Sequence, residues 1–284
     1  MKKSLIALAL ASAFAANAFA EEAAPAAPAG PHTLTGNIGL FSSYRFRGID
    51  QTFGKPALQG GFDYSHESGF YAGNWNSNVS SGAGYPEGNL EMDFYGGYKT
   101  TFGDFGLDVG GLYYYYPGSS YNNAALNAKH PTKLANGVVK NGELYIAGTW
   151  KFITLKYSYA VTDYFKLPET QGSGYLDLSA SYDLGDGWGV NGHVGHLYLK
   201  DFRWVNADTT TYGGSYTDWK LGVTKDISGW VIGASYIGTN AKGTCGNVEM
   251  YCFSNDMNTA GAGSGSKTKD AGRGIAVLSV SKTF

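Results

Sequence analysis

The segment from Glu143 to Val161, ELYIAGTWKFITLKYSYAV, alternates between apolar and polar positions with a period of two. One face holds apolar side chains, namely Leu144, Ile146, Trp150 and Phe152, and the other holds Glu143, Lys151 and small polar residues. A soluble sheet buries the apolar face and exposes the charged one. A transmembrane barrel does the reverse, with lipid outside and water within. The pattern therefore predicts strands but leaves open which face points inward.

The same alternation recurs along most of the chain. It predicts twelve strands, at about 33–47, 56–66, 69–79, 89–102, 104–116, 142–152, 153–162, 173–184, 187–200, 215–226, 229–239 and 271–284. Most of these segments have an apolar face of several residues, as at Leu176, Leu178, Ala180, Tyr182 and Leu184. On a tilted strand such a face matches an apolar band about 25 Å tall.

The connections between the predicted strands alternate in length. Every second connection is tight, around 66–69, 102–104, 152–153, 184–188 and 226–229, whereas the others are longer, above all after Tyr116 and after Thr239. Short periplasmic turns at one rim and long extracellular loops at the other are typical of outer-membrane barrels. We therefore predict an all-β fold, a transmembrane antiparallel up-and-down β-barrel of about twelve strands, with the apolar faces toward lipid. The alternative is a secreted soluble β-protein.

The N-terminus has the features of an export signal. Lys2 and Lys3 precede an apolar run, and the small residues Ala18 and Ala20 end it, so residues 1–20 are predicted to be a secretory signal peptide rather than a short membrane anchor. An Ala- and Pro-rich leader is expected at 21–32 in the periplasm, and the barrel at 33–284. This organisation predicts the outer membrane of a Gram-negative bacterium.

Composition narrows the classes further. Glycine (42 residues) and tyrosine (22) are frequent, and charged residues make up only 15%, which suits many glycine-punctuated strands. Of the 21 basic residues, Lys2 and Lys3 belong to the signal peptide, so the exported chain keeps 19 against 23 acidic residues. Without a basic excess, nucleic-acid binding is not expected. The last predicted strand ends at Phe284, as in terminal strands read by the outer-membrane assembly machinery, although Lys282 interrupts its apolar face.

The strand phases assign the charged side chains of the predicted lumen. The basic set is Arg45, Arg47, Lys99, Lys151, Lys156, Lys220 and, less securely, Arg273; the acidic set is Asp63, Glu91, Asp93, Asp108, Glu143, Asp177, Asp183 and Asp218. A cylinder of twelve strands tilted by about 40° is roughly 25 Å across. Because acidic and basic side chains are nearly equal in number, this wall allows two outcomes: a wet pore with a transverse electric field, or a network of salt bridges that closes the interior.

The remaining motifs give weaker indications of function. Cys245 and Cys252 are predicted to form a disulfide in the last long loop, and no metal site is expected because this segment lacks histidine. Four consecutive tyrosines, 113–116, are interpreted as an interfacial girdle with alternate rings facing the lumen, rather than as a sugar-stacking platform. The segment 261–268 lacks a glycine that a phosphate loop needs. His193 and His196 fall on opposite faces of a strand, and a hydrolase would need a serine beside one of them. We expect no enzyme activity and no cofactor.

The chain resembles the TorF-type family of proteobacterial outer-membrane porins, whose role is unassigned. The matching positions are Ser43, Tyr44, Phe46, Arg47, Gly48, Gln51, Thr52, Pro56, Ala57, Gln59, Asp63, Gly69, Phe70, Tyr71, Gly73, Trp75, Asn78, Glu91, Asp93, Tyr95, Gly97, Tyr98 and the segment 155–165. The resemblance implies a barrel and a pore and brings no catalytic residues. In the first hairpin we expect Arg47, with Gln51, to form the constriction or to fix the first loop inside; the alternative is an ion pair between Arg47 and Asp63.

These expectations lead to three functional classes. The first is an outer-membrane porin for passive diffusion of small hydrophilic solutes. The second is a closed barrel that acts through its loops in adhesion, as a receptor or in the envelope structure, and the third is an outer-membrane enzyme. In the first two, outer-membrane lipid surrounds the barrel.

Overall fold

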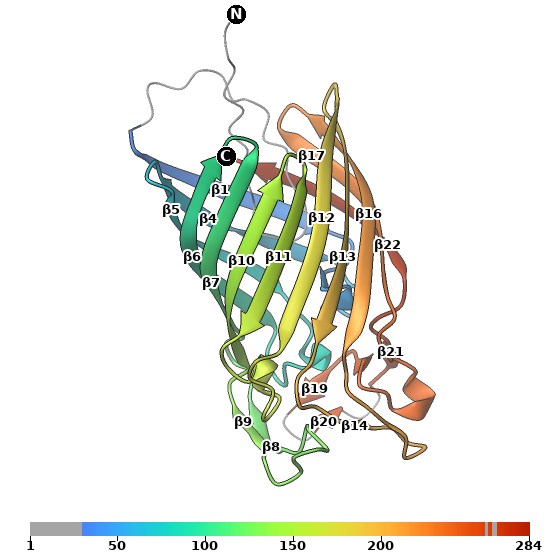
Figure 1. The fold of residues 1–284 in the computed structure, drawn as a ribbon. Coiled ribbons are helices and arrows are strands. Elements are labelled where there is room, and N and C mark those ends of the chain that lie inside the picture. The colour runs from blue at the N-terminus through green and yellow to red at the C-terminus, as the bar shows by residue number, and fades with distance from the viewer. Residues whose placement is uncertain (1–29, 259–260, 263–265) are drawn as a thin grey trace, which may run out of the picture.

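Twelve long antiparallel strands close into one barrel in the computed structural model, which describes residues 30–258, 261–262 and 266–284 (Figure 1). Within these residues the wall consists of β1 (His32–Phe41), β4 (Ala57–His66), β5 (Phe70–Asn78), β6 (Leu90–Phe102), β7 (Phe105–Tyr115), β10 (Lys140–Trp150), β11 (Ile153–Ala160), β12 (Gly174–Gly185), β13 (Trp188–Tyr198), β16 (Tyr216–Ile227), β17 (Trp230–Thr239) and β22 (Ile275–Thr283). The predicted fold class is confirmed. Among the described residues, none of the helices has the length and apolar character needed to cross a bilayer.

Each wall strand pairs with its neighbours in the chain, and the first pairs with the last. In β1 and β22, Leu40 lies opposite Val280 and Asn37 opposite Thr283. The closure continues one residue further, because the Gly36 nitrogen donates to the Phe284 oxygen at 2.7 Å and the Phe284 nitrogen donates to the Gly36 oxygen at 2.9 Å. Closure pairs the strand edges that would otherwise be left open.

The connections separate by length between the two ends of the barrel. Five two- or three-residue turns join the wall strands at one end, which also holds both described termini, and we call it the short-turn end (Figure 1). The long connections, at 42–56, 79–89, 116–139, 161–173, 199–215 and 240–274, gather at the opposite, long-loop end (Figure 1). The predicted alternation of loop lengths is confirmed.

Alternate side chains point outward and inward along each wall strand. Outward residues such as Leu34 (71% exposed) and Leu221 (66%) form an apolar exterior, whereas inward residues such as Tyr114 and Asp218 are almost fully buried. Exposed aromatic side chains mark the short-turn end of this exterior: Phe70, Phe102, Phe105, Trp150, Trp188 and Trp230. Apolar surface flanked by aromatic side chains fits a bilayer rather than water. The exterior therefore answers the question raised by the alternation at 143–161: Leu144 and Ile146 are exposed and Glu143 is buried.

Small two-stranded sheets and single helical turns fill the long-loop end. The sheets are β2 (Arg45–Phe46) with β3 (Ile49–Asp50), β8 (Tyr121–Ala124) with β9 (Ala135–Gly137), β14 (Trp204–Val205) with β15 (Thr211–Tyr212), β18 (Cys252–Ser254) with β21 (Thr268–Asp270), and β19 (Met257–Asn258) with β20 (Gly261–Ala262). The 3-10 turns are η1 (Ser81–Ala83), η2 (Tyr164–Lys166) and η3 (Cys245–Asn247). Cys245 and Cys252 form the predicted disulfide.

Three expectations differ from the structure or fall outside it. The first wall strand was expected to reach residue 47, but β1 ends at Phe41 and the chain then turns into the barrel. The last was expected from 271, but β22 begins at Ile275. The predicted signal peptide (1–20) and most of the predicted leader (21–32) lie outside the described residues, as does part of the glycine-rich segment at 261–268.

Candidate functional site: the lumen and the first loop

The connection from β1 to β4, residues 42–56, folds back into the lumen, and we call it the first loop. Its strands β2 and β3 pair Arg45 with Asp50 and Phe46 with Ile49. Arg47 and Gly48 form the tip, with positive φ angles of 47° and 78°. Two successive positive φ angles belong to the type I′ turn, whose twist matches that of a β-hairpin. A side chain at Gly48 would collide with wall residues, because a Cβ there would lie 2.3 Å from Thr239 Cγ2 and 2.7 Å from Asp218 Cβ.

The tip of this hairpin is bound to the far side of the barrel. Arg47 donates through Nη2 to Glu143 Oε2 at 2.8 Å and through Nη1 to the Tyr164 hydroxyl at 3.0 Å. Its guanidinium also lies 4.3 Å from the ring centroid of Tyr175. Glu143 is on β10 and Tyr175 on β12, the two strands that flank β11, which lies opposite β1 in the strand order. The first loop therefore crosses the whole lumen.

The ion pair at the tip is secluded from solvent. The side chains of Arg47 and Glu143 are 8% and 2% exposed. Glu143 also accepts from Asn141 Nδ2 at 3.0 Å, so its carboxylate is anchored on its own strand before Arg47 reaches it. A charge-assisted hydrogen bond in a dry site is stronger than one in water, and loss of either partner leaves a buried charge uncompensated.

The base of the hairpin is held by Asp50 and Gln51. One oxygen of Asp50, Oδ1, accepts from the Thr52 and Gly54 nitrogens at 3.1 and 2.9 Å, while the other forms an ion pair with Arg45 at 3.5 Å. The Gln51 amide donates to the Ile49 oxygen at 2.9 Å and accepts from the Tyr85 hydroxyl at 2.5 Å. These bonds fix the loop conformation from within.

Aromatic residues fill the space between the first loop and the wall of β5, β6 and β7. Buried members of this cluster are Tyr44, Trp75, Tyr85, Tyr114 and Tyr116. The Tyr85 and Tyr116 rings stack with centroids 3.9 Å apart. At the long-loop end the lumen is thus occupied by the first loop and these rings.

Two carboxylates are buried beneath this aromatic cluster. Glu91 and Asp93 face inward from β6 and both are 0% exposed. Glu91 accepts from the Tyr44 hydroxyl at 3.1 Å. Within the described part of the chain, neither carboxylate oxygen of Asp93 has a hydrogen-bond partner. Burial of an unpaired carboxylate is costly, so it is unusual for a residue that has only a structural role.

The lumen wall from the first loop toward the short-turn end is polar on both sides. On one side, the Tyr95 hydroxyl donates to Asp63 at 2.5 Å, the Tyr71 hydroxyl donates to Asp108 at 2.6 Å, and Lys99 is 4.0 Å from Asp108. Asp63 also accepts from Asn37, at 3.2 Å. The acidic residues on this side are therefore bound mainly by phenols rather than by cations.

On the other side, His193 lies between two aspartates. Its Nδ1 is 2.8 Å from Asp177 and its Nε2 is 3.5 Å from Asp218, which also accepts from the Tyr175 hydroxyl at 2.9 Å. Ser179 is the cross-strand partner of His193, but both ring nitrogens face carboxylates. A serine hydrolase needs one of these nitrogens directed at the serine hydroxyl.

Two lysines project into the same part of the lumen from β11 and β16. Lys156 Nζ lies 3.9 Å from the Tyr145 ring centroid. Among the described residues, no carboxylate lies within ion-pair distance of Lys156 or Lys220. These lysines leave positive charge on the polar wall between the first loop and the short-turn end.

Most of the predicted lumen residues fall into two groups in the structure. Those at the first loop are Arg45, Arg47, Gln51, Glu91, Asp93 and Glu143; those on the polar wall are Asp63, Lys99, Asp108, Lys156, Asp177 and Lys220. Two of them are exposed near the short-turn end. Lys151 is a turn residue with a φ of 55°, because β10 ends at Trp150, and its Nζ lies 4.9 Å from the Trp150 ring. Asp183 lies near the end of β12 and accepts from the Gly185 nitrogen at 2.8 Å. Arg47 pairs with Glu143 and not with Asp63.

Several contact residues were not singled out from the sequence as parts of a site. His193 was weighed only as a metal ligand or as the base of a hydrolase; its inward phase, which it shares with Asn191 on β13, could also have placed it among the lumen residues. Tyr85 and Tyr164 lie in long connections without periodicity, so no pattern indicated their direction. The role of Asp50 depends on the β2–β3 hairpin, which is absent from the long first strand that the alternation predicts.

Comparisons with known proteins identify a family and several similar solved structures. The model of a bacterial family described as "Bacterial protein of unknown function (Gcw_chp)" matches residues 25–262. No curated protein matches the chain by sequence. Similar solved structures include the COG4313 outer membrane channel from Pseudomonas putida F1 (12% identity, TM-score 0.41, covering 93% of this chain and 100% of that one). The Pseudomonas putida toluene transporter TodX has 10% identity, a TM-score of 0.40 and coverages of 90% and 89%. Acinetobacter baumannii OccAB4 has 13% identity and a TM-score of 0.39, with 88% of this chain spanning 62% of that longer one.

Proposed function

We propose that this chain, which belongs to the Gcw_chp family of bacterial proteins of unknown function, is an outer-membrane channel for passive diffusion of small hydrophilic solutes. In this proposal the structure is the closed state, and solutes pass when the first loop moves away from the far wall. The resemblance to TorF-type porins supports the same class. The proposal includes no catalytic step.

The exterior supports insertion in the outer membrane. Large apolar side chains project from the wall strands, and the closed barrel leaves no strand edge for lipid to meet. In that setting the short-turn end faces the periplasm and the long-loop end faces outside the cell. In this proposal the assembly machinery reads the terminal strand β22 and Phe284 during assembly. In the folded barrel the same segment pairs with β1.

The observation that carries the channel proposal is the first loop itself. It is a hairpin hinged between adjacent strands β1 and β4, and its tip makes its hydrogen bonds to the far wall through the side chain of Arg47. Behind it, Lys156 and Lys220 project into the polar part of the lumen. A barrel that its core closes permanently does not need ionisable side chains in the lumen, because burial of charge costs free energy. A first loop that can leave the lumen, above a polar passage, accounts for both the hinged hairpin and the lysines.

Planar-bilayer recording tests this proposal. The refolded chain should give discrete, infrequent current steps under a salt gradient, and Arg47→Ala should raise the open probability because it removes the bond to Glu143. Arg203→Ala is the matched control, since Arg203 is an exposed arginine of an outer loop. Silence from both the native chain and Arg47→Ala, with folding verified by heat-modifiable gel mobility, would refute the channel.

One observation favours a second candidate, a closed barrel that acts through its loops in adhesion, as a receptor or in the envelope structure. The side chains of the aromatic cluster, Tyr44, Trp75, Tyr85, Tyr114 and Tyr116, are each 8% exposed or less, as in the core of a protein. If this packing never opens, Arg47→Ala will change stability but will produce no current.

A further inference from the structure

The outward face of β5 is polar, whereas the outward faces of its neighbours β4 and β6 are apolar. The buried side chains of Trp75 and Ser77 point into the lumen, so the alternate positions, Asn74, Asn76 and Asn78, point outward. Among the described wall strands, β5 is the only one with carboxamide side chains on its outward face. This row of asparagines therefore interrupts the apolar exterior.

The cross-strand neighbours of these asparagines place the row at the depth of the apolar band. Asn74 lies between Phe62 on β4 and Phe94 on β6, whose side chains are 61% and 44% exposed. Asn76 follows on the same face, opposite Gly60, which has no side chain to cover it. With the barrel in the outer membrane, acyl chains surround this depth, and they neither donate nor accept hydrogen bonds. Polar side chains in such a position are costly and indicate a function.

The amides bond to the wall without using all of their hydrogen-bonding groups. Asn76 Nδ2 donates to Asn74 Oδ1 at 2.7 Å and to the Gly60 oxygen at 3.4 Å, and Asn74 Nδ2 donates to the Asp93 oxygen at 2.9 Å. Within the described residues, Asn76 Oδ1 accepts no hydrogen bond, and Asn74 uses only one of its two N–H groups. The outward face thus keeps one acceptor and one donor side by side.

We propose that the outward face of β5 is the contact surface for a second copy of this chain, and that the two barrels pair across a two-fold axis. The spare donor of Asn74 and the spare acceptor of Asn76 make this face complementary to itself. Across a two-fold axis Asn74 of one copy bonds to Asn76 of the other, and symmetry repeats the bond in reverse. Asparagine side chains join transmembrane segments by such bonds. The inference rests on the proposed placement in the outer membrane and is independent of conduction.

The relief on either side of β5 fits the same symmetry. A two-fold axis along the membrane normal places β4 of one copy against β6 of the other. On the β4 side, the exposed side chains of Leu58 and Phe62 protrude from the wall. On the β6 side there is an open hollow, lined on its outward surface by Phe94, Gly96, Gly111, Tyr113, Gly142 and Val161. The protruding side of each copy therefore faces the hollow side of the other.

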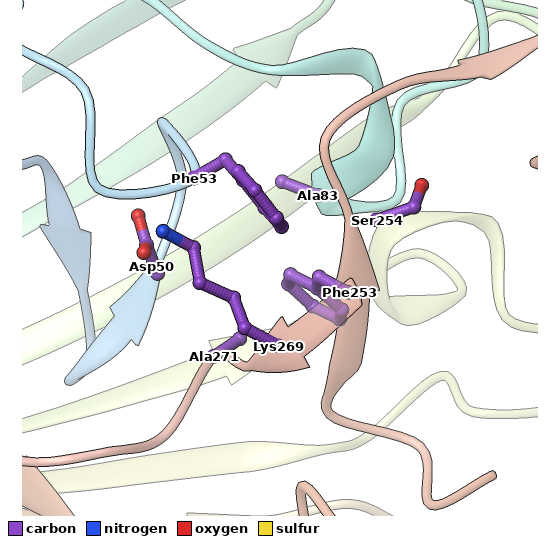
Figure 2. A pocket seen from close by; sticks show the side chains of 7 residues that line it. All are labelled: Asp50, Phe53, Ala83, Phe253, Ser254, Lys269 and Ala271. Atoms are coloured by element: carbon purple, nitrogen blue, oxygen red, sulfur yellow. The ribbon is translucent and has the colours of Figure 1, made fainter. Parts of the chain in front are cut away.

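The cleft at the long-loop end gives a partner no comparable surface. It lies between the first loop and the strands β18 and β21, where Phe53, Phe253 and Lys269 meet (Figure 2). Lys269 Nζ lies 4.0 Å from the Phe53 ring centroid, and no part of the cleft is wide enough for a water molecule. A side chain of a second copy cannot enter there.

Disulfide cross-linking of the refolded full chain in lipid vesicles, at low protein density, tests the position of the contact. Asn76→Cys puts a thiol beside the proposed two-fold axis, where it meets its own copy, and the two native cysteines are already bonded to each other. Oxidation should give mainly a product of twice the chain mass. Val194→Cys is the matched control, because Val194 is an exposed residue of β13, six strands from β5 in the closed order, and should not cross-link.

Sedimentation equilibrium in a mild detergent tests the role of the amides. The native chain should sediment as a dimer. The double variant Asn74→Leu, Asn76→Leu should raise the dimer dissociation constant on the order of tenfold, since each bond across the interface contributes about threefold. Leucine suits a position that faces lipid, so the variant should keep its heat-modifiable mobility. His196→Leu is the matched control, because it replaces an exposed polar residue on the outward face of β13 and should leave the constant unchanged.

Three results would overturn the proposal: a native chain that is monomeric in detergent and does not cross-link at position 76 in vesicles, a dimer that the double variant leaves unchanged, or a trimer. Where detergent alone separates the copies, the cross-link in vesicles decides. Neither measurement needs conduction. A dimer without bilayer currents would therefore support this inference and refute the channel, whereas currents from a monomer would do the opposite.

Discussion

Glu143→Gln is the sharpest perturbation of the closed state. The amide keeps the size of the carboxylate and can still bond to Asn141 and Tyr114, but it removes the charge that faces Arg47. Loss of one partner of a buried ion pair costs about 3–5 kcal/mol. Because the Tyr164 hydroxyl and the Tyr175 ring still hold the guanidinium, we take the lower end, about 3 kcal/mol. This corresponds to an increase on the order of 100-fold in the equilibrium constant for opening of the first loop.

Amide hydrogen exchange read by mass spectrometry measures this change. Peptides that cover residues 42–56 should exchange on the order of 100-fold faster in Glu143→Gln than in the native chain. Peptides from the wall strands should be unaffected. Asp63→Asn is the matched control, because Asp63 is a lumen carboxylate bound to Tyr95 and Asn37 rather than to the first loop.

A double-mutant cycle with Arg47→Met identifies the cause. If the ion pair is responsible, the double variant should exchange much less rapidly than the two single effects together predict, because neither charge is then left unpaired. Unchanged exchange at 42–56 in Glu143→Gln, or simple additivity in the cycle, would show that aromatic packing and not the ion pair holds the loop.

Three further predictions concern other parts of the molecule. Reduction of the Cys245–Cys252 disulfide should make the last loop more sensitive to protease, with a local loss on the order of 2–3 kcal/mol, and should leave the heat-modifiable mobility of the barrel unchanged. Hydrogen bonds from Lys129 and His130 lower the pKa of Asp201, so its contribution to loop order is complete above about pH 4 and is lost as the pH falls through that lowered pKa; protease sensitivity at 125–135 should rise only in acid. Gly195→Ala should destabilise the barrel by about 1–3 kcal/mol in urea unfolding, because the new Cβ would lie 2.0 Å from the Tyr175 hydroxyl.

The wall could be predicted because its signal is local. A membrane barrel repeats one constraint, lipid on alternate side chains, along every strand, so the phase of Leu144 and Ile146 could be read without knowledge of their neighbours. Lys151 shows where this fails. Parity alone assigns it to the lumen, but the strand ends one residue earlier, and strand ends depend on turn geometry rather than on the alternation.

The first loop could not be predicted in the same way because its contacts are not local. Arg47 and Glu143 are 96 residues apart in the chain. Periodicity identified both as inward, yet any of several acidic residues could have been the partner of Arg47. The length of the hairpin and the turn at Gly48 determine which acidic residue pairs with Arg47. Only a residue without a side chain can make this turn so close to Thr239 and Asp218.

In the proposed channel, the attachment of the first loop at both ends decides how a closed barrel reopens. A blocker supplied by another molecule would be lost on dilution, but residues 42–56 are joined to β1 and β4, so their effective concentration at the far wall is constant. The fraction of closed barrels is then a property of a single molecule, independent of how much protein the membrane contains. The first loop can close the barrel again without an encounter between molecules, because every folded barrel contains the segment that closes it.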